Sequence, residues 1–582
     1  MSKIYRIAFL LFFNAAFAAA GLAADLIVTK TADTSDGSCD ADCSLREAIA
    51  AANASAEADV IRFDPEVFAT PQTITLGGSE LVIQNSSPVT IIGSGAKFLT
   101  ISGNNASRIL MVGRSSSASI YGITFTGGNG IGPQDSGRGG ALYNYGGNML
   151  VSDCVISGNT ANTGGGLNSA QSSSPTPAVT PVTTIRNTVV ANNTSVSSGG
   201  GMQNFSTSTL FIENCLFTNN QSGGSTGGGG MQANGIVRIS NSTFSGNRSP
   251  GGTGGGLQSN GGDQILTNVT VTGNTATNNG GGIHRASSVA GLFLRNTIIA
   301  GNTGVSTSPD VTNITNGTFV SQGNNIIGNV GTSTGWTAAD LTNTDPLLTP
   351  LGSYGGPVMS HALLDNSPAI DAGSGCVLDI SCTAANPPFV IRTDSRGAAR
   401  FGGVDIGAYE AAADYLATLP SASVGTAYAF RLIPNTGTFT FSVVDGSFAP
   451  FTLAADTTLS GSSAAAGAFY AVVEAAGGTG TARNNYVLNV LADPDLVPVS
   501  GRVVSTSGTP VRNARVVLSS STEKRVALTN GFGYFSFQGV PRGDLYELSA
   551  SSREYPNFIP REIYVADADS GLLLSPAAIS AK

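Results

Sequence analysis

Charged side chains are scarce in this chain. Only 11% of its 582 residues are Asp, Glu, Lys or Arg, and the formal net charge is −9. Nucleic-acid-binding proteins carry a basic patch or stripe, so this composition argues against a nucleic acid as partner. No stretch after residue 20 is long and apolar enough to cross a bilayer as a helix, so no transmembrane segment is expected.

Histidine, tryptophan and acids are also rare. The two histidines are His284 and His361, and the one tryptophan is Trp336. We interpret His284 as a solvated turn residue, because a lone histidine without acidic partners makes a poor base or metal site. From Gly139 to Asn302 the acids are limited to Asp153, Glu213 and Asp263. The sequence therefore predicts no catalytic residue, no metal site and no cofactor.

The main feature of the sequence is an internal repeat. Six times between Gly139 and Ile283, two or more glycines are followed by an apolar residue. Between successive glycine runs, an Asn or Asp is followed six positions later by a second Asn. After the first interval, equivalent Asn residues in successive repeats are 27 or 28 residues apart. The first members are Asp153, Asn187, Asn214, Asn241, Asn268 and Asn296, and the second are Asn159, Asn193, Asn220, Asn247, Asn274 and Asn302. A fixed period of this length indicates a stack of supersecondary units.

Apolar residues flank the first Asn with a period of two, which predicts short strands and no helix. We therefore predict an all-β chain, in which a right-handed single-stranded parallel β-helix is followed by two small β-sandwich domains. The Asn should mark corners, and both Asn columns should form ladders in which each amide bonds its counterpart in the next coil. The prolines within 172–181 predict a projecting loop.

Export is predicted by the N-terminus. Lys3 and Arg6 precede an apolar run and small residues, which is typical of a secretory signal peptide at 1–24, with cleavage after Ala20 or Ala24. We expect a secreted or cell-surface protein. Two local disulfides are then expected, one between Cys39 and Cys43 and one between Cys376 and Cys382. Cys154 and Cys215 should remain free and buried, because two coil steps separate them by about 9–10 Å.

Residues 25–58 are predicted to cap the first coil. Ser44 and Glu47 form a capping-box pattern that opens a short helix ending at Ala54. The acidic turn before this helix contains Asp33, Asp36, Asp40 and Asp42. We interpret the turn as a polar, disulfide-closed loop; the alternative is a calcium site, although no full calcium-loop spacing is present.

Several motifs resemble known families. Gly-Gly-Ala-Leu at 139–142 and the Phe-x-x-Asn tetrapeptides resemble repeats of polymorphic outer-membrane proteins, and the segment 43–49 resembles the N-terminal box of bacterial CSLREA surface proteins. Segments 345–348, 367–373 and 404–410 resemble the choice-of-anchor Q domain. The resemblance implies an exported β-helix protein, with repeats at 59–335 and closing coils at 336–411.

The last third of the chain changes character. Residues 412–492 resemble the Ig-like modules of bacterial surface proteins. Residues 496–570 resemble the carboxypeptidase regulatory-like domain, a transthyretin-like sandwich. The resemblance implies the fold of this domain and leaves its ligand open.

Parallel β-helices often act on polysaccharides, and a glycosidase needs two facing carboxylates. Glu213 should point outward in a mixed row with Arg186, Ser240, Thr267 and Arg295, without a paired acid. We interpret Asp153 as a structural corner residue. The acids that match the closing motif are Asp371, Asp394, Asp405 and Glu410; we interpret them as buried turn acceptors and partners of Arg396 or Arg400, with a metal site as the alternative.

Three functions remain open. The first is an exported, non-catalytic surface or matrix protein, an adhesin-like rod that binds polysaccharide or cell-surface glycan. The second is a polysaccharide lyase or glycoside hydrolase of the parallel β-helix type, with acids supplied by loops or by the closing segment. The third is a carbohydrate-binding C-terminal domain that targets the rod. We favour the first, because the repeat body contains so few catalytic groups.

Overall fold

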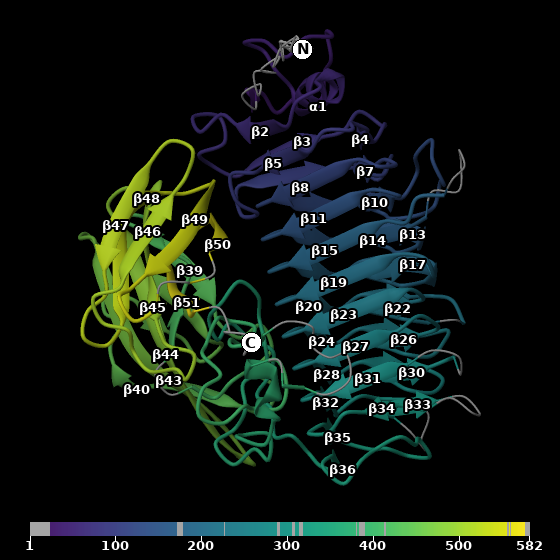
Figure 1. Cartoon of the computed structure of the whole chain (residues 1–582), viewed down its shortest axis with the longest axis vertical. Helices are drawn as coiled ribbons and strands as arrows, with labels where there is room; N and C mark the ends of the chain where they lie inside the picture. The colour runs from purple at the N-terminus through teal and green to yellow at the C-terminus, as the bar shows by residue number, and fades with distance from the viewer. Residues whose placement is uncertain are drawn as a thin grey trace, which may run out of the picture.

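The computed structural model describes residues 24–171, 178–225, 227–287, 291–304, 309–313, 318–379, 381–382, 390–412, 415–555, 558 and 560–576. The chain is nearly all β: a parallel solenoid of about nine turns is followed by small antiparallel domains, which confirms the predicted fold class (Figure 1). The predicted signal peptide and residues 172–177 of the predicted loop lie outside the described residues. Among the described helices, none is long and apolar enough to span a membrane.

Three long parallel sheets and one short one form the walls of the solenoid. Sheet A contains β1 (Ala24–Val28), β2 (Asp59–Phe63), β5 (Val89–Ile92), β8 (Ser117–Tyr121), β11 (Asn148–Ser152), β15 (Val182–Arg186), β19 (Thr209–Glu213), β23 (Ile236–Ser240), β27 (Gln264–Thr267), β31 (Leu292–Arg295) and β34 (Val320–Ser321). Sheet B contains β3 (Gln72–Thr75), β6 (Leu99–Ser102), β9 (Thr124–Thr126), β12 (Val155–Ser157), β16 (Val189–Ala191), β20 (Leu216–Thr218), β24 (Thr243–Ser245), β28 (Thr270–Thr272), β32 (Ile298–Ile299), β35 (Ile326–Ile327) and β36 (Leu341–Thr342).

The remaining walls follow the same order along the axis. Sheet C contains β4 (Leu81–Ile83), β7 (Leu110–Val112), β10 (Leu142–Tyr145), β14 (Leu167–Ala170), β18 (Met202–Asn204), β22 (Met231–Ala233), β26 (Leu257–Ser259), β30 (Ile283–Arg285) and β33 (Val311–Asn313). Sheet D contains β13 (Thr160–Thr163), β17 (Thr194–Ser198), β21 (Gln221–Ser222), β25 (Arg248–Ser249) and β29 (Thr275–Ala276). Each coil contributes one strand to a sheet, so a coil has no core until its neighbours cover it.

The core consists of files of identical positions. In sheet A, Ile212 pairs with Ile185 of the preceding coil and with Ile239 of the next. In sheet B the rings of Phe217 and Phe244 stack with their centroids 4.7 Å apart. Full burial of each such side chain stabilises the fold by about 1.5–3 kcal/mol, so the repeat period itself builds the core.

Both ends of the solenoid are covered. Helix α1 (Leu45–Ala54) begins after Ser44, and both bonds of the predicted capping box are present. Leu45 and Ile49 of this helix join the core of the solenoid. At the other end the Trp336 ring stacks on Phe319, with centroids 5.0 Å apart. The caps protect the terminal coils, whose edges would otherwise be exposed.

Residues 343–412 do not continue the solenoid among the described residues. This closing segment has one 3-10 helix, η1 (Gly375–Leu378), and short antiparallel bridges such as Leu348 with Leu363. The predicted closing coils at 336–411 therefore end, among the described residues, at β36. Prolines at 346, 350 and 357 explain the difference, because proline cannot donate to a central strand.

Two antiparallel domains follow. The first has a sheet of β37 (Leu416–Thr418), β38 (Ala422–Ser423), β40 (Thr440–Gly446), β43 (Gly467–Gly477) and β44 (Gly480–Leu491), and a smaller sheet of β39 (Tyr428–Arg431), β41 (Thr452–Leu453) and β42 (Thr458–Gly461). The second has β45 (Leu496–Val503), β48 (Tyr534–Pro541) and β51 (Asp569–Leu574) in one sheet, and β46 (Arg515–Ser519), β47 (Lys524–Leu528), β49 (Asp544–Ser551) and β50 (Arg561–Val565) in the other.

The chain folds back on itself, so that both domains lie beside the solenoid (Figure 1). The C-terminal domain contacts the first coils: Arg62 pairs with Asp544 at 2.7 Å, and the Tyr564 hydroxyl donates to the Gly93 carbonyl at 2.7 Å. A Cβ at Gly122 would lie 2.2 Å from the Tyr564 oxygen, so only glycine leaves room for this contact. The side of the solenoid that faces the two domains is therefore closed to a large ligand.

Candidate functional site

The second Asn column forms a continuous ladder inside the solenoid. Each side-chain amide donates to the carboxamide oxygen of the next coil at 2.9–3.0 Å, through Asn159, Asn193, Asn220, Asn247, Asn274 and Asn302. The same oxygen also accepts the backbone N–H of the preceding Asn. Asp310 ends the ladder by accepting from Asn302 at 2.9 Å. All are buried, so this column holds the corner together and offers nothing to a ligand.

The first Asn column has a different structure from the predicted ladder. Its members are left-handed, with φ between 46° and 57° at Asp153, Asn187, Asn214, Asn241, Asn268 and Asn296, a conformation that Asn and Asp tolerate better than other residues. In the upper coils the amides still connect, since Asn214 donates to Asn187 and Asn187 donates to Asp153. In the lower coils Asn241, Asn268 and Asn296 donate instead to carbonyls of the closing segment, at Thr393, Asp405 and Ser374.

The outward turn of these amides has a physical cause. A left-handed corner points its side chain away from the core, where the closing segment offers carbonyl groups as acceptors, two of which also accept from Arg400. Asn296 makes a reciprocal pair, because its oxygen also accepts the Ser374 N–H at 2.8 Å. Asn324 continues the row by donating to Ala372 at 2.9 Å. The side chains of the first Asn column thus form the surface on which residues 372–405 dock.

The acids of the closing motif are held by cations and by backbone N–H groups. Asp394 accepts from Arg396 Nε at 2.8 Å, and Glu410 pairs with Arg400 at 2.7 Å. Burial raises the pKa of Glu410 above its usual value, and Arg400 opposes that rise. Asp405 accepts the N–H groups of Asp371 and Ala411. These three carboxylates are engaged within the protein, which suits a structural role better than proton transfer.

Asp371 is an exception to the prediction of buried acceptors. It is exposed and has a left-handed φ of 54°, so the prediction was wrong for this residue. Its backbone N–H, and not its carboxylate, makes the contact with Asp405.

Glu213 lies on the outer face of sheet A in the predicted row, and it pairs with Arg186 of the preceding coil at 3.3 Å.

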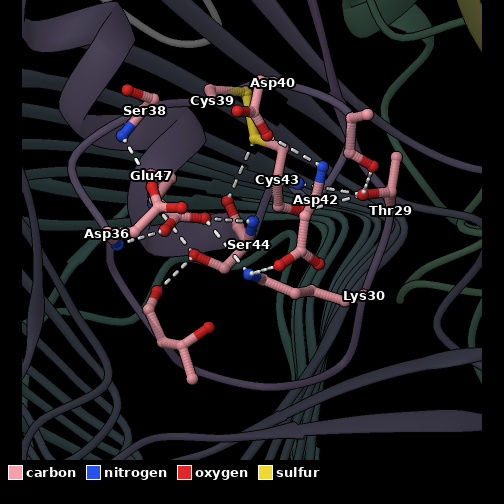
Figure 2. Close-up of a disulfide and its surroundings, with 12 residues drawn as sticks. Thr29, Lys30, Asp36, Ser38, Cys39, Asp40, Asp42, Cys43, Ser44 and Glu47 are labelled. Carbon is pink, nitrogen blue, oxygen red and sulfur yellow. Dashed lines mark hydrogen bonds and ion pairs between the residues drawn. A yellow bond between two sulfur atoms is a disulfide. The ribbon is translucent and has the colours of Figure 1, made fainter.

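The N-terminal turn is closed by the Cys39–Cys43 disulfide (Figure 2). Lys30 pairs with Asp42 at 2.9 Å, and Asp33 pairs with Arg46 at 2.8 Å. Hydrogen bonds from the Ser44 and Asp36 N–H groups, both at 2.7 Å, lower the pKa of Glu47 to about 2. In the part of the chain that the structure describes, no three acidic, His or Cys side chains are placed to hold a metal ion.

This hydrogen bonding predicts an acid-sensitive cap. The pKa of Glu47 is lower in the folded protein than the unfolded value of about 4.3, so its stabilisation is complete above that value and is lost as the pH falls through about 2. Peptic cleavage within residues 25–58, followed by mass spectrometry, should rise steeply over this window. Glu47→Gln keeps only one of the two acceptor oxygens and cannot titrate, so its cap should be weaker at every pH while its cleavage changes less between about pH 4 and pH 2. Equal profiles for the two proteins would contradict the assignment.

The other cysteines also match their predictions. Cys376 and Cys382 form the second disulfide, and Cys154 and Cys215 are free and buried. Burial raises the pKa of both thiols to about 12. Thiols that are buried and protonated are poor nucleophiles, so neither cysteine is a candidate for catalysis.

His284 is buried, so its interpretation as a solvated turn residue was wrong, and His361 is half-buried. The Nδ1 atom of His284 lies 2.8 Å from the Thr312 hydroxyl of the next coil, and burial lowers its pKa to about 4. His361 joins the closing segment to sheet B, with Nε2 3.0 Å from the Ser245 hydroxyl, and burial lowers its pKa to about 4 as well. Neutral, hydrogen-bonded imidazoles of this kind act as spacers between elements.

The burial of His284 reveals a third polar column that the sequence analysis missed. On the outer side of sheet C, one register position is occupied by Tyr143, Asn168, Gln203, Gln232, Gln258, His284 and Thr312. Asn168 donates to Gln203, and Gln203 donates to Gln232. The signal was present in the repeat alignment, because each of these residues except Thr312 directly follows the apolar residue after a glycine run.

The outer face of sheet A carries most of the exposed large apolar side chains among the described residues of the solenoid, with Val196 of sheet D and Ile131 exposed elsewhere. The pairing register places Phe211, Arg238, Ile265, Phe293 and Val320 in one file on five successive strands. Phe211 is 36% exposed, and Ile236, in the neighbouring file, is 44% exposed. The row of Arg186 and Glu213 runs beside them. We call these side chains of sheet A, from Arg186 to Val320, the flank.

The flank combines features that suit a long polar polymer. Its strands are flat, parallel and repeated at about 4.8 Å, so equivalent groups recur along the axis at one fixed step. Phe211 and Phe293 offer ring faces, and Arg186 and Arg238 offer N–H donors. Rigid backbone beneath the side chains keeps their spacing, which lowers the entropy lost on binding.

Comparisons with known proteins bear on only part of the chain. A search of curated proteins found no significant match. Among solved structures, the Bacillus anthracis TIE protein is 9% identical over 27% of this chain and 39% of its own length, with a TM-score of 0.13. BcpA, the major pilin subunit of Bacillus cereus, is 8% identical over 28% and 67%, with a TM-score of 0.13.

A third structure is a SusE-like, surface-located polysaccharide-binding protein from the Bacteroides thetaiotaomicron heparin utilisation locus. It is 12% identical over 26% of this chain and 32% of its own length, with a TM-score of 0.12. Scores this low support no argument about function. Residues 498–573 match the carboxypeptidase regulatory-like domain, which confirms the resemblance predicted for 496–570. The family match thus covers the C-terminal domain, and the solenoid has to be judged by its own geometry.

Proposed function

We propose that this protein is an exported, non-catalytic surface protein that binds a polysaccharide along the flank of its solenoid. The proposal includes membership of the bacterial proteins with a CSLREA box and a choice-of-anchor Q segment, on the motifs at 43–49, 345–348, 367–373 and 404–410. The boundaries at 24, 58, 335, 411 and 492 belong to the same proposal. The predicted signal peptide and the two disulfides support a location outside the cell.

One observation carries the proposal: most of the exposed large apolar side chains of the described solenoid lie on the outer face of sheet A, in two neighbouring files. Phe211, Ile236 and Val320 are each at least 36% exposed there, on strands that repeat with the period of the solenoid. Exposed apolar side chains that alternate with charged and polar groups make this face a candidate interaction surface. A periodic polymer is the ligand whose own repeat can use this regular spacing.

Binding to a polysaccharide panel tests the flank. Phe211→Ala together with Phe293→Ala should weaken binding at least tenfold, which corresponds to about 1.4 kcal/mol, because the ring faces are removed. Val196→Ala is the matched control, since Val196 is 71% exposed on sheet D, away from the flank. If the double variant and the control both bind as tightly as the wild type, the flank is not the binding site.

The same panel separates the alternatives. Release of reducing or unsaturated ends, lost in Asp371→Asn or Glu213→Gln, would identify an enzyme of the lyase or hydrolase class in place of a binding protein. Binding that survives the flank variant but is lost in Tyr534→Ala would move the site to the C-terminal domain. Tyr534 is 43% exposed there, and the Arg502 guanidinium carbon lies 5.2 Å from its ring centroid.

A further inference from the structure

One end of the C-terminal domain exposes large apolar side chains. Phe532, in the turn at 529–533, is 71% exposed, and Leu528 and Tyr534 on either side of this turn are 65% and 43% exposed. With Val526, they are four of the fifteen large apolar side chains that are exposed among the described residues of the chain. We call Leu528, Phe532 and Tyr534 the apolar tip. Their concentration within a few residues makes this end a candidate interaction surface.

The apolar tip lies at the end of the domain opposite to its contacts with the first coils. Strand β48 begins at the tip, with Tyr534, and leads to the turn at 541–544, where Arg542 and Asp544 contact the solenoid. An extended strand of eight residues spans roughly 25 Å, so the tip lies about that far from these contacts. Figure 1 places β47, which ends at Leu528, on the side of the domain away from the solenoid.

Two arginines lie beside the apolar tip. Arg515 is the cross-strand neighbour of Leu528 in the pairing of β46 with β47. Arg512 precedes Asn513, whose backbone N–H donates to the Thr529 carbonyl at 3.0 Å, so this arginine flanks the turn. Both arginines are exposed, and within the described part of the chain neither guanidinium forms an ion pair. Both groups are therefore available to an anionic partner.

The charge of this end contrasts with that of the chain, whose formal net charge is −9. Arg553 is exposed two residues beyond Ser551, which is the neighbour of Arg515 in the pairing of β46 with β49. The Arg502 guanidinium carbon lies 5.2 Å from the centroid of the Tyr534 ring. In the loop of Arg553 there is one exposed acid, at position 554. The four arginines at this end outnumber that acid, so the surroundings of the apolar tip are positively charged.

We propose that the apolar tip inserts into the interfacial layer of an anionic lipid membrane, where the surrounding arginines bind lipid phosphates. The side chains of Leu528 and Phe532 contain no polar atom, so their transfer from water into the acyl-chain boundary is favourable. Apolar side chains of interfacial segments lie about 5–10 Å deep in this boundary, a depth that the side chains of a turn can reach. The Tyr534 hydroxyl stays at the headgroup level, and guanidinium groups bind phosphate through two parallel hydrogen bonds.

An anionic polysaccharide would also satisfy the arginines, but it does not suit the apolar tip. A sugar ring packs on the flat face of an aromatic ring, and it offers no apolar layer that covers the protruding Leu528. The turn at 529–533 joins β47 and β48, which belong to different sheets, so the tip is convex. A membrane covers such a protrusion on all sides, which makes lipid the partner that fits. A single tip of this size gives weak and reversible attachment.

Flotation of the full-length protein with lipid vesicles tests the proposal. Phosphatidylcholine vesicles that contain about 30% phosphatidylglycerol should bind it about tenfold more tightly than vesicles of phosphatidylcholine alone, and added salt should remove this difference. Leu528→Ser together with Phe532→Ser should weaken the binding by about tenfold or more, because the inserted surface is lost. Tyr470→Ser is the matched control, since Tyr470 is 55% exposed on β43 of the other antiparallel domain, and it should bind as the wild type does.

Substitution of the arginines separates charge from insertion. Arg512→Gln together with Arg515→Gln should weaken binding to the anionic vesicles by about tenfold or more, but it should leave binding to neutral vesicles unchanged. The Phe532→Trp variant reports insertion directly. Its fluorescence emission should shift to the blue when anionic vesicles are added, beyond any change in the signal of the native Trp336.

Two results would overturn the proposal. The first is equal binding, or no binding, to anionic and neutral vesicles, and the second is wild-type binding by the variant that lacks Leu528 and Phe532. Polygalacturonate, a soluble anionic polysaccharide, tests the other partner: if it binds the tip and the Phe532→Trp emission does not shift with vesicles, the partner is a polysaccharide. The flank variant Phe211→Ala with Phe293→Ala should bind vesicles as the wild type does, so the flank and the apolar tip are tested separately.

Discussion

Asn220→Ala should lower the free energy of unfolding by about 3–5 kcal/mol, the largest effect that we expect from a single polar substitution in the solenoid. Asn220 donates to the Val190 carbonyl at 2.8 Å and to Asn247 at 2.9 Å, and its oxygen accepts two N–H groups of Asn193. Alanine would leave these partners buried without bonds. Because the ladder joins six successive coils from Asn159 to Asn302, the coils on both sides of Asn220 should loosen together.

Denaturant unfolding, followed by far-UV circular dichroism, measures this effect. Asn162→Ala is the matched control, because Asn162 is an exposed Asn of the same coil stack whose oxygen accepts one surface bond from Ser197. The control should change the free energy of unfolding by less than about 0.5 kcal/mol. A loss below about 1 kcal/mol for Asn220→Ala would show that relaxation or water replaces the ladder bonds.

Arg400→Met should destabilise the docked closing segment by about 3–5 kcal/mol, because it leaves Glu410 buried without its cation. Arg400 also donates to the Gly407 carbonyl at 2.9 Å and to Asn241 of the solenoid at 3.3 Å, so the substitution also removes a link between the two parts. Proteolysis within residues 343–412 should become faster, and it should do so before the solenoid itself unfolds.

The double variant Arg400→Met with Glu410→Leu separates charge from packing. It should recover about 2 kcal/mol or more of the loss, since no unpaired carboxylate remains. The pH dependence gives a further check. Burial raises the pKa of Glu410 to about 8 even beside Arg400, and loss of Arg400 raises it more, so the charge part of the deficit should be largest at alkaline pH and should be lost as the pH falls below about 8, where the carboxyl is protonated in both folded proteins. A deficit that is independent of pH would contradict a charge effect.

Most of the solenoid could be predicted because its period is a local property of the sequence. Ile185, Ile212 and Ile239 occupy the same place in successive repeats, and pairing of like strands needs no other information. The helical cap was found for the same kind of reason, since Ser44 and Glu47 are three residues apart and make each other's bonds. The local disulfides join cysteines four and six residues apart.

The prediction was weaker where a side chain meets a distant segment. Asn241 looked like Asn214 in the repeat, yet one donates to residue 393 and the other to Asn187. His284 follows a glycine run and was therefore assigned to a solvated turn, but the next coil covers it and Thr312 bonds it. In each case the position of the residue in the repeat was identified correctly, but its hydrogen-bond partner could not be predicted from that position.

The sequence by itself determined the stacked coils, their register, the corner residues and the cap, because each repeat meets a near copy of itself. Only the tertiary structure decided that the chain folds back, that the first Asn column carries the closing segment, and that the C-terminal domain covers the first strands of sheet A while side chains such as Phe211 and Val320 stay exposed farther along it. These contacts join unlike surfaces as distant as Arg62 and Asp544, which are 482 residues apart. Neither the repeat period nor the spacing of motifs can predict such a pairing, because it depends on the shape and charge of two surfaces that form only when the chain has folded.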